Sequence, residues 1–230
     1  MAYWGYFPFI EDFLENIENP QVIEVGVDKA QMFIPLLVWM KLNKQRFSLL
    51  GIDVVKRTEL TLQLDLICRW TTPKQQVHFM VGSSLEALPA LLEHEENKGA
   101  ADLVLLDGDH NYYTVKRELE CINELMSDHG IIIVDDYHGE GGTQDEFFSE
   151  FQGYEDINGP VSREAATDNN PENVGVKAAV DQFLIQNKEW ALTSDIKPGY
   201  EPVVLYKPDH IGLSKIDPEN QYRPKKRKGV

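Results

Sequence analysis

The sequence predicts an α/β domain built around a mostly parallel sheet of seven strands. Short apolar runs rich in β-branched residues alternate with amphipathic stretches of helical spacing, and an acid or a glycine lies at the end of several of these runs. The chain has 230 residues, of which 42% are apolar, so it can bury one large core. We therefore expect a single domain over residues 1–207 and a polar, basic tail over residues 208–230.

The first half of the chain predicts four strands separated by helices. Its first strand, VIEVGV, is a buried β-branched run that ends beside Gly26. Such alternation favours parallel pairing, because consecutive parallel strands need a crossover connection that is usually a helix. We expect strands at 22–27, 47–53, 77–81 and 101–107, and helices at 31–42, 60–70, 84–94 and 113–126.

The second half supplies the remaining three strands. The segment IIIVDD, at 131–136, is the most β-prone of the chain, and Asp128–Gly130 predicts a turn before it. Residues 139–173 are polar, acidic and interrupted by glycine and proline, which predicts a long lid-like loop. A helix at 174–187 and two strands at 190–194 and 202–206 complete the domain. We expect these strands to form an antiparallel hairpin joined through Lys197–Gly199.

The charge balance favours small molecules as partners. The 38 acidic and 22 basic residues give a formal charge of −16, which repels nucleic acid and anionic membranes. The basic run near the end of the tail resembles an import signal, but we interpret it as a solvated terminus. Cys68 and Cys121 lie in predicted helices, and neither a signal peptide nor an apolar run of membrane length is visible, so we expect a cytoplasmic protein. The oligomeric state, including a homo-oligomer, stays open.

A candidate cofactor site follows the first two strands. Gly26 would let the backbone approach a ligand closely, Glu24 lies just before it, and Asp53 ends the second strand, where a carboxylate can bind ribose hydroxyls. Together these residues indicate an adenosyl-type ligand. The alternative is an ordinary turn glycine and a helix-capping aspartate. The fingerprint G-x-G-x-x-G is absent, which disfavours a pyrophosphate ligand.

A second group of candidate residues follows the fourth and fifth strands. The segments D-G-D-H (107–110) and D-D-Y-H (135–138) lie at neighbouring strand ends, which are about 4.8 Å apart in a sheet. Asp107, Asp135 and Asp136 can therefore share one cation such as Mg²⁺, Mn²⁺ or Ca²⁺. Turn formation and helix capping are the alternative roles. His110 and His138 lie beside this group, and either could accept a proton.

These segments resemble a known family. The order VIEVGV, GID, VGSSLEALPALL, ADLVLLDGDH, IIIVDDYH and VGVKAAVDQFL is similar to class I S-adenosylmethionine-dependent methyltransferases, in particular the macrocin-type and mycinamicin-type sugar O-methyltransferases. The resemblance covers roughly residues 20 to 207. It implies a Rossmann-like sheet in the order 3-2-1-4-5-7-6 with helices on both faces, and S-adenosylmethionine bound at the carboxyl ends of the first strands.

The resemblance also implies residue roles. Glu24 and Gly26 match the cofactor loop, Asp53 matches the ribose-binding acid, Ser83 and Ser84 match the segment beside the adenine, and Asp107 is expected to border the cofactor as well as the metal. The metal aspartates match Asp107, Asp135 and Asp136, and the general base falls on His138, ahead of His110. Two departures stand out: Ser83 replaces an aspartate, and Ala30 replaces a glycine.

The predicted function is therefore methyl transfer from S-adenosylmethionine to a hydroxyl group of a small molecule, sugar-like or natural-product-like, assisted by a divalent metal, expected to be Mg²⁺. Two alternatives stay open. One is a metal-dependent hydrolase or hydroxylase-like enzyme on the same fold, and the other is a non-catalytic protein that binds an adenosyl ligand. Binding of S-adenosylhomocysteine without added metal distinguishes transfer from metal-dependent water chemistry.

Overall fold

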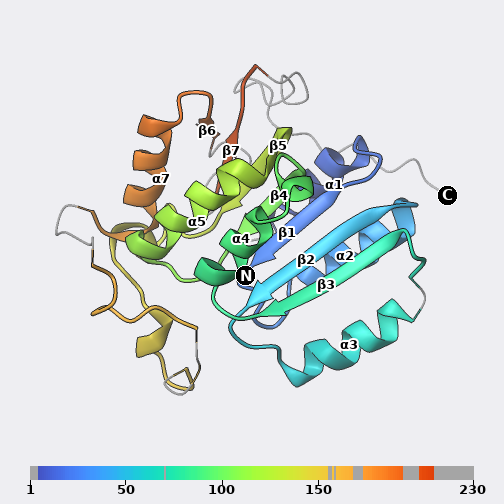
Figure 1. Ribbon diagram of the computed structural model, residues 1–230, viewed down its shortest axis with the longest axis horizontal. Helices are drawn as coiled ribbons and strands as arrows, with labels where there is room; N and C mark the ends of the chain where they lie inside the picture. Colours follow the sequence, from blue (N-terminus) through green and yellow to red (C-terminus); the bar gives the residue numbers. More distant parts are fainter. Residues whose placement is uncertain are drawn as a thin grey trace.

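Seven strands form one sheet in the order β3-β2-β1-β4-β5-β7-β6 (Figure 1). The computed structural model describes residues 5–69, 71–154, 157, 159–167, 173–193 and 202–209. Strands β1 to β5 pair in parallel, whereas β7 is antiparallel to both β5 and β6. The expected strand order and the antiparallel last pair are confirmed. The strands are β1 Gln21–Val25, β2 Phe47–Asp53, β3 Gln75–Val81, β4 Ala101–Leu106, β5 Met126–Val134, β6 Ala191–Thr193 and β7 Val203–Tyr206.

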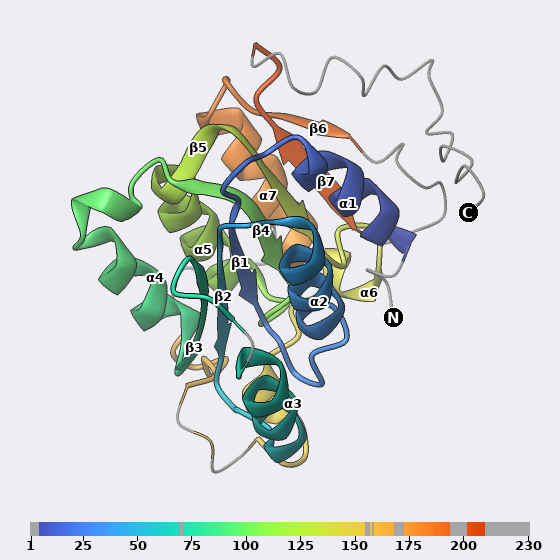
Figure 2. The same ribbon diagram turned by 90° about the vertical axis from the view of Figure 1, so that its right-hand side faces the viewer.

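Helices cover both faces of the sheet, as expected (Figure 2). One layer packs α1 (Phe7–Glu15), α2 (Phe33–Asn43) and α3 (Thr58–Cys68) against one face. The other layer packs α4 (Ser84–Leu92), α5 (Tyr112–Leu125) and α7 (Gly175–Gln186) against the opposite face. The domain is thus a three-layer sandwich with the sheet in the middle.

The central strands are buried on both sides, which explains their continuous apolar sequences. In β4, Leu103 and Leu105 join the core beneath α1 to α3, whereas Val104 and Leu106 join the core beneath α4, α5 and α7. The four residues 131–134 of β5 alternate between the two cores in the same way. Because side chains alternate across a strand, only a run that is apolar at every position can fill both layers.

Two local features differ from the sequence-based expectation. The turn expected at Asp128–Gly130 is wrong, because these residues lie within β5, where Ala101 pairs with Met126 but Leu103 pairs with Ile131. The extra residues form a bulge, and a Cβ on Gly130 would lie 2.8 Å from the Ala101 carbonyl oxygen, so glycine is needed there. Helix α1 was not expected, although Pro8 in its first turn and the spacing of Ile10 and Leu14 predict a helix.

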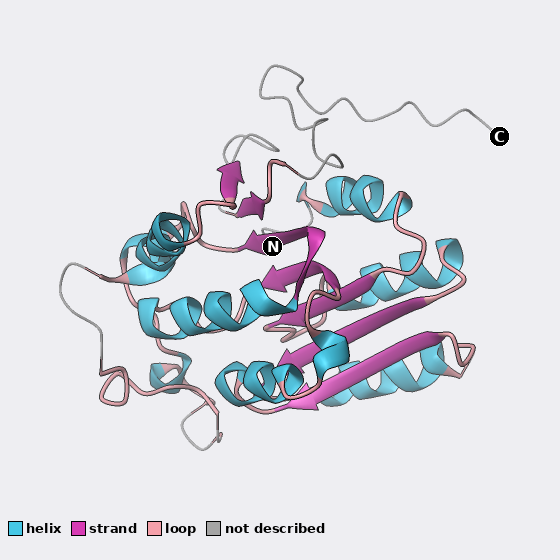
Figure 3. Cartoon of the chain, turned by 45° about the horizontal axis from the view of Figure 1, so that its top comes forward, coloured by secondary structure: helices cyan, strands magenta, loops and turns pink. Residues whose placement is uncertain are grey.

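The segment after β5 lies beside the carboxyl ends of the parallel strands (Figure 3). It contains the short helix α6 (Glu140–Thr143) and the 3₁₀ turn η3 (Phe148–Glu150), and another turn, η2 (Glu95–Asn97), follows α4. The hairpin connection at Lys197–Gly199 and the tail from residue 210 lie outside the described residues. Within the described part, none of the helices combines the length and apolarity that a membrane crossing requires.

Candidate active site

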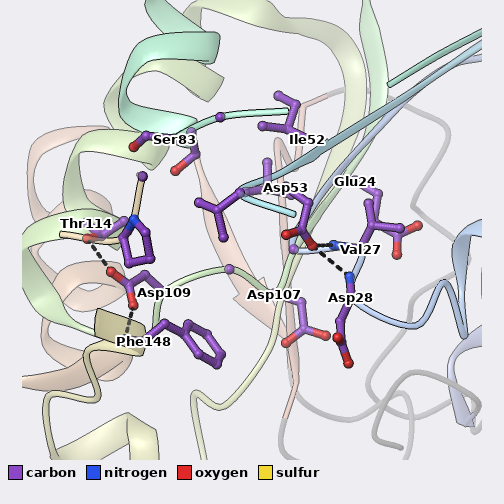
Figure 4. Close-up of a pocket in the computed structure, with 18 of the residues that line it drawn as sticks. Glu24, Val27, Asp28, Ile52, Asp53, Ser83, Asp107, Asp109, Thr114 and Phe148 are labelled. Carbon is purple, nitrogen blue, oxygen red and sulfur yellow. Dashed lines mark hydrogen bonds between the residues drawn. The ribbon is translucent and has the colours of Figure 1, made fainter. Parts of the chain in front are cut away.

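A cavity of about 470 Å³ opens at the carboxyl ends of β1 to β4. Its volume falls within the range of small-molecule sites, and its position is where open parallel sheets bind ligands. All predicted cofactor residues line it: Glu24, Gly26, Asp53, Ser83, Ser84 and Asp107. Figure 4 shows the carboxyl groups of Glu24, Asp28, Asp53 and Asp107 on one side, and Asp109, Thr114 and Phe148 on the other.

The loop after β1 contains three residues with positive φ, namely Gly26, Asp28 and Ala30. Gly26 has φ +81°, and an added Cβ would lie 1.8 Å from the carbonyl oxygen of Asp107, so only glycine lets β1 turn against the end of β4. Ala30 has φ 57° and is buried. This left-handed conformation costs an alanine about 1–2 kcal/mol. The cost explains why the resemblance places a glycine at this position.

Asp53 holds this loop in place through its carboxylate. One oxygen accepts the backbone N–H groups of Val27 at 2.8 Å and Asp28 at 2.7 Å, and the other accepts that of Val55 at 2.9 Å. A carboxylate offers about four acceptor positions. About one acceptor position is therefore left for a ribose hydroxyl. Asp53 thus fixes the loop and also lines the cavity.

Glu24 gives the cavity a buried acidic wall. Its side chain is 4% exposed, and its Oε2 atom has no hydrogen-bond partner among the described residues. Burial, together with the charges of Asp107 and Asp53, raises the pKa of Glu24 well above its usual range. A cationic ligand group beside these carboxylates would lower that pKa and relieve the unfavourable burial.

Ser83 and Ser84 lie where β3 leads into α4. The Ser83 hydroxyl oxygen accepts the backbone N–H of Leu85 at 3.2 Å and so caps the helix. Both serines also line the cavity, at the end that contains Asp109 and Thr114. The capping role accounts for a serine at 83 where the resemblance has an aspartate, since both residue types cap helices well.

The two acidic segments meet at the ends of β4 and β5. Leu106 pairs with Val134, so Asp107 and Asp135 follow in register. The imidazole of His110 contacts both segments: its Nε2 atom lies 3.2 Å from Oδ1 of Asp107, and its Nδ1 atom lies 2.7 Å from Oδ2 of Asp136. Burial opposes a charged imidazole, but hydrogen bonds to Asp107 and Asp136 outweigh it and hold the pKa of His110 well above its usual range.

The cluster carries more negative than positive charge. Asp135 is 8% exposed, and its Oδ1 atom has no hydrogen-bond partner among the described residues. Burial, followed by the charge of Asp107, raises the pKa of Asp135 to about 8. Glu146 adds a further carboxylate: ligand atoms of His110, Asp136 and Glu146 lie within 4.8 Å of one another. Among the described residues, this close group contains Asp136 but not the other two predicted metal aspartates, Asp107 and Asp135.

Comparison with known families assigns the chain to a family. A family model described as a methyltransferase domain matches residues 17–137, which contain β1 to β5, the segment D-G-D-H and the first three residues of D-D-Y-H, but not His138. The chain belongs to this methyltransferase family. The expected class, the class I S-adenosylmethionine-dependent methyltransferases, is thereby confirmed. No curated protein sequence matches the chain.

Solved structures with the same fold include sugar O-methyltransferases. CalS11, a TDP-rhamnose 3'-O-methyltransferase of calicheamicin biosynthesis, has a TM-score of 0.59 at 15% identity over 90% of this chain and 79% of its own. A Corynebacterium glutamicum protein has a TM-score of 0.55 at 15% identity, with 90% and 81% covered. MycE of mycinamycin biosynthesis, solved with Mg and SAH, has a TM-score of 0.52 at 13% identity; the alignment covers 88% of this chain and 49% of MycE. These identities show a shared fold.

The methyltransferase anchors the segment after β5 to the site through polar contacts. Asp109 accepts the backbone N–H of Phe148 at 2.8 Å, and the backbone N–H of Glu146 donates to the His110 carbonyl oxygen at 3.0 Å. Phe148 then lines the cavity and packs edge-on against the His110 ring, with centroids 6.0 Å apart. The segment expected to be a lid thus touches both the cavity and the acidic cluster.

An ion pair joins the mouth of the cavity to the same segment. Arg57, just before α3, pairs with Asp28 of the β1–α2 loop and donates to the Tyr154 hydroxyl at 3.3 Å. Gly159–Val161 complete this side of the cavity. No sequence motif indicated Arg57, Tyr154 or Glu146. Arg57 lies just before a helix, and the other two lie in a loop, where polar side chains are ordinary.

The structure separates the two candidate histidines. His110 is 14% exposed in its side chain and lies within the acidic cluster, whereas His138 is exposed in the turn that follows Asp135 and Asp136. The His138 ring packs edge-on against Tyr137, with centroids 4.8 Å apart. Tyr137 is itself held by a hydrogen bond to Asp181 at 2.7 Å. His138 therefore lies on a turn that is fixed at its neighbour, with its ring accessible.

Proposed function

We propose that this methyltransferase transfers a methyl group from S-adenosylmethionine to a hydroxyl group of a small molecule, and that a divalent cation bound by Asp107, Asp135 and Asp136 assists the reaction. One observation carries the proposal: Asp107 lines the cofactor cavity and also belongs to the acidic cluster. A donor and a cation at these two places would be neighbours. Methyl transfer requires this arrangement, because the acceptor oxygen must reach both the methyl group of the donor and the cation.

The cavity suits the methyl donor in shape and charge. S-Adenosylmethionine supplies a methyl group on a positively charged sulfonium. Glu24 and Asp107 present carboxyl groups on the side of the cavity where that charge is favoured, and Asp53 keeps one acceptor position for a ribose hydroxyl. Ser83 and Ser84 border the opposite end, where an adenine ring fits.

The acidic cluster suits a cation because its charges are not balanced within the described residues. A divalent ion, proposed as Mg²⁺, would lower the pKa of an acceptor hydroxyl group that it coordinates. Asp135 is the residue that gains most from such an ion, because its buried carboxyl group has an unpartnered oxygen. Glu146 lies close enough to His110 and Asp136 to serve as a further ligand.

His138 is proposed as the base that removes the proton of the acceptor hydroxyl. Its ring is exposed, and its turn directly follows Asp135 and Asp136. His110 already contacts two carboxylates, which favours its charged form. We therefore assign His110 a positioning role: it holds the carboxylates of Asp107 and Asp136 in place.

The acceptor is proposed to be a sugar-like or natural-product-like hydroxyl compound. The formal charge of −16 disfavours a nucleic acid acceptor. Phe148 borders the cavity and His110, and it packs against Phe151, which is 44% exposed. These rings offer an apolar surface to the ring of an acceptor. Phe147, in contrast, is fully buried and belongs to the core.

Two measurements test the proposal. Titration calorimetry of S-adenosylhomocysteine into metal-free protein should show binding at one site, and addition of Mg²⁺ should then be needed for transfer of a labelled methyl group to hydroxylated sugars or phenols. Binding without transfer to any acceptor of this panel would favour a non-catalytic adenosyl-binding protein. Metal-dependent water chemistry without cofactor binding would favour a hydrolase-like or hydroxylase-like enzyme.

A further inference from the structure

Strand β3 forms one end of the sheet and pairs only with β2 among the described residues. Hydrogen bonds from Phe47 N–H to the Lys74 carbonyl and from Gly82 N–H to the Asp53 carbonyl show that even-numbered residues of this strand face β2. Backbone groups alternate along a parallel strand. The N–H and carbonyl groups of Val77, Phe79 and Val81 therefore point outward, away from the sheet.

The sequence of β3 itself lacks the residues that usually protect a free strand, although Lys56 lies over the Phe79 ring at 5.5 Å. Gln75–Val81 contains no proline, lysine, arginine, aspartate or glutamate. Its seven residues pair with β2 without any register shift, so no bulge twists the edge away. Val81 is also 62% exposed. An edge of this length and composition is an efficient template for an added strand.

A groove begins at this edge and extends across one face of the sheet over β2 and β1, where Ser48, Leu50 and Gln21 line it. It has a volume of about 640 Å³, and Gln76, His78 and Met80 of β3 line it from the face turned toward α4. Arg46 and Lys74 lie at its rim, and no aspartate or glutamate lines it. The chain as a whole has 38 acidic residues and a negative charge, whereas the side chains that line this groove include two cations and no carboxylate.

We propose that the β3 edge and this groove bind an extended acidic peptide segment of a partner protein. The main chain of the segment would pair with the outward groups of Val77, Phe79 and Val81. Its carboxylate side chains on one face would contact Arg46 and Lys74. Main-chain pairing supplies affinity in this mode of recognition, and the side chains of alternate residues supply specificity.

Charge decides between an acidic partner and a second copy of this chain. Antiparallel pairing of two copies of Gln75–Val81 about its central residue would place Lys74 of each copy beside the opposite end of the other strand, at Val81 and Gly82. The strand of a second copy contains no aspartate or glutamate, so it would supply no carboxylate to Arg46 or Lys74. An acidic strand instead finds complementary charge along the groove, and its binding should weaken as salt is raised.

The experiment uses the full chain and three fluorescein-labelled octapeptides: alternating Glu and Val, alternating Lys and Val, and alternating Glu and Pro. Fluorescence anisotropy at low salt should show binding of the Glu-Val peptide, with at least about tenfold weaker binding of both others. Equal binding of the Lys-Val peptide would overturn the charge argument. Equal binding of the Glu-Pro peptide would overturn strand pairing.

Two variants test the assigned surface. The double variant Arg46→Glu/Lys74→Glu should weaken binding of the Glu-Val peptide at least about tenfold. Lys188→Glu, at an exposed site on another part of the surface, should leave this affinity unchanged. Val77→Pro removes one outward N–H group and leaves the hydrogen bonds to β2 intact. It should therefore weaken binding of the Glu-Val peptide as much as the double variant does. Unchanged S-adenosylhomocysteine binding shows that each variant is folded. Two results together would overturn the proposal in favour of a second copy. These are that none of the three peptides binds and that the protein is a dimer which Val77→Pro dissociates.

Discussion

The Nδ1 atom of His110 lies 2.7 Å from a carboxylate oxygen of Asp136, and this contact links the loop after β4 to the turn after β5. The same imidazole reaches Asp107 through its other nitrogen. One imidazolium thus stands among the carboxyl groups of Asp107, Asp135, Asp136 and Glu146. The remaining negative charge makes this region sensitive to pH and to divalent cations.

The metal-free protein should become less stable as pH rises from about 4 to about 8. The ordinary pKa of an aspartate is 3.8, and burial raises that of Asp135 to about 8, so over this window the folded state holds a proton that the unfolded state has lost. Unfolding free energy falls with pH when the folded state binds more protons. His110 acts in the same direction, because its stabilising contribution is lost as pH rises through its raised pKa.

Chemical denaturation at pH 5 and pH 8 in EDTA measures this slope. Added Mn²⁺ should raise the unfolding free energy more at pH 8 than at pH 5, and Asp135→Asn should flatten the slope in EDTA. A slope that Asp135→Asn leaves unchanged would remove this residue as its source.

Glu118→Gln should stabilise the protein at alkaline pH. The Glu118 side chain is 1% exposed beneath Gly108, and burial, only partly offset by the hydroxyl of Ser84, raises its pKa to about 7. Unfolding therefore releases a proton between pH 4.5 and about 7, and stability is lost over that window. At about 1.4 kcal/mol for each pH unit, glutamine should add up to ~3 kcal/mol at pH 8 and almost nothing at pH 4.

Urea denaturation of both proteins at the two pH values checks this prediction. An equal difference between the variant and the parent at pH 4 and pH 8 would show that Glu118 titrates normally.

Asp53→Asn should weaken cofactor binding by about tenfold or more. The substitution replaces one acceptor oxygen by an NH₂ group, which cannot accept from the N–H groups of Val27, Asp28 or Val55. Loss of such bonds costs about 1–3 kcal/mol, and 1.4 kcal/mol corresponds to tenfold in affinity. Calorimetry with S-adenosylhomocysteine measures the change. Asp65→Asn, at an exposed position of α3, is the matched control, and equal affinity of the two variants would remove Asp53 from the site.

His138→Ala should lower turnover by about 10²–10⁴-fold while the affinity for S-adenosylhomocysteine stays nearly unchanged. The loss is confined to turnover because the base acts on the acceptor and not on the cofactor. His110→Ala should instead weaken cation binding, since its ring holds two of the proposed ligands. His94→Ala, at an exposed position, controls for loss of a histidine. Full turnover in His138→Ala would transfer the role of base to another residue.

The sheet could be predicted from the sequence because its central strands contain runs that are apolar at successive positions, such as 103–106 and 131–134, a pattern that a doubly covered strand requires. The acidic residues that follow β2, β4 and β5 were visible for a related reason, since a parallel sheet brings such ends to one edge. The positions of Gly26 and Asp53 were predicted, but the three backbone N–H groups that Asp53 accepts were not, because they depend on the path of the loop after β1.

The contributions of the loop after β5 could not be predicted. Glu146, Phe148 and Tyr154 reach the site because Asp109 and the His110 carbonyl group bind backbone N–H groups of that loop. Such contacts join residues far apart in the chain and leave no periodic signal. The bulge in β5 was missed for a different reason: Asp128–Gly130 has the composition of a turn, and only the pairing of Ala101 with Met126 reveals a strand.

Direct titration of Mn²⁺ into the protein, followed by electron paramagnetic resonance with S-adenosylhomocysteine present, tests the shared cation site most directly. One ion per chain should bind, with affinity reduced at least about a hundredfold in Asp135→Asn, because the buried oxygen of Asp135 has no other partner among the described residues. Equal Mn²⁺ affinity in the parent and the variant, or no binding to the parent, would contradict this expectation.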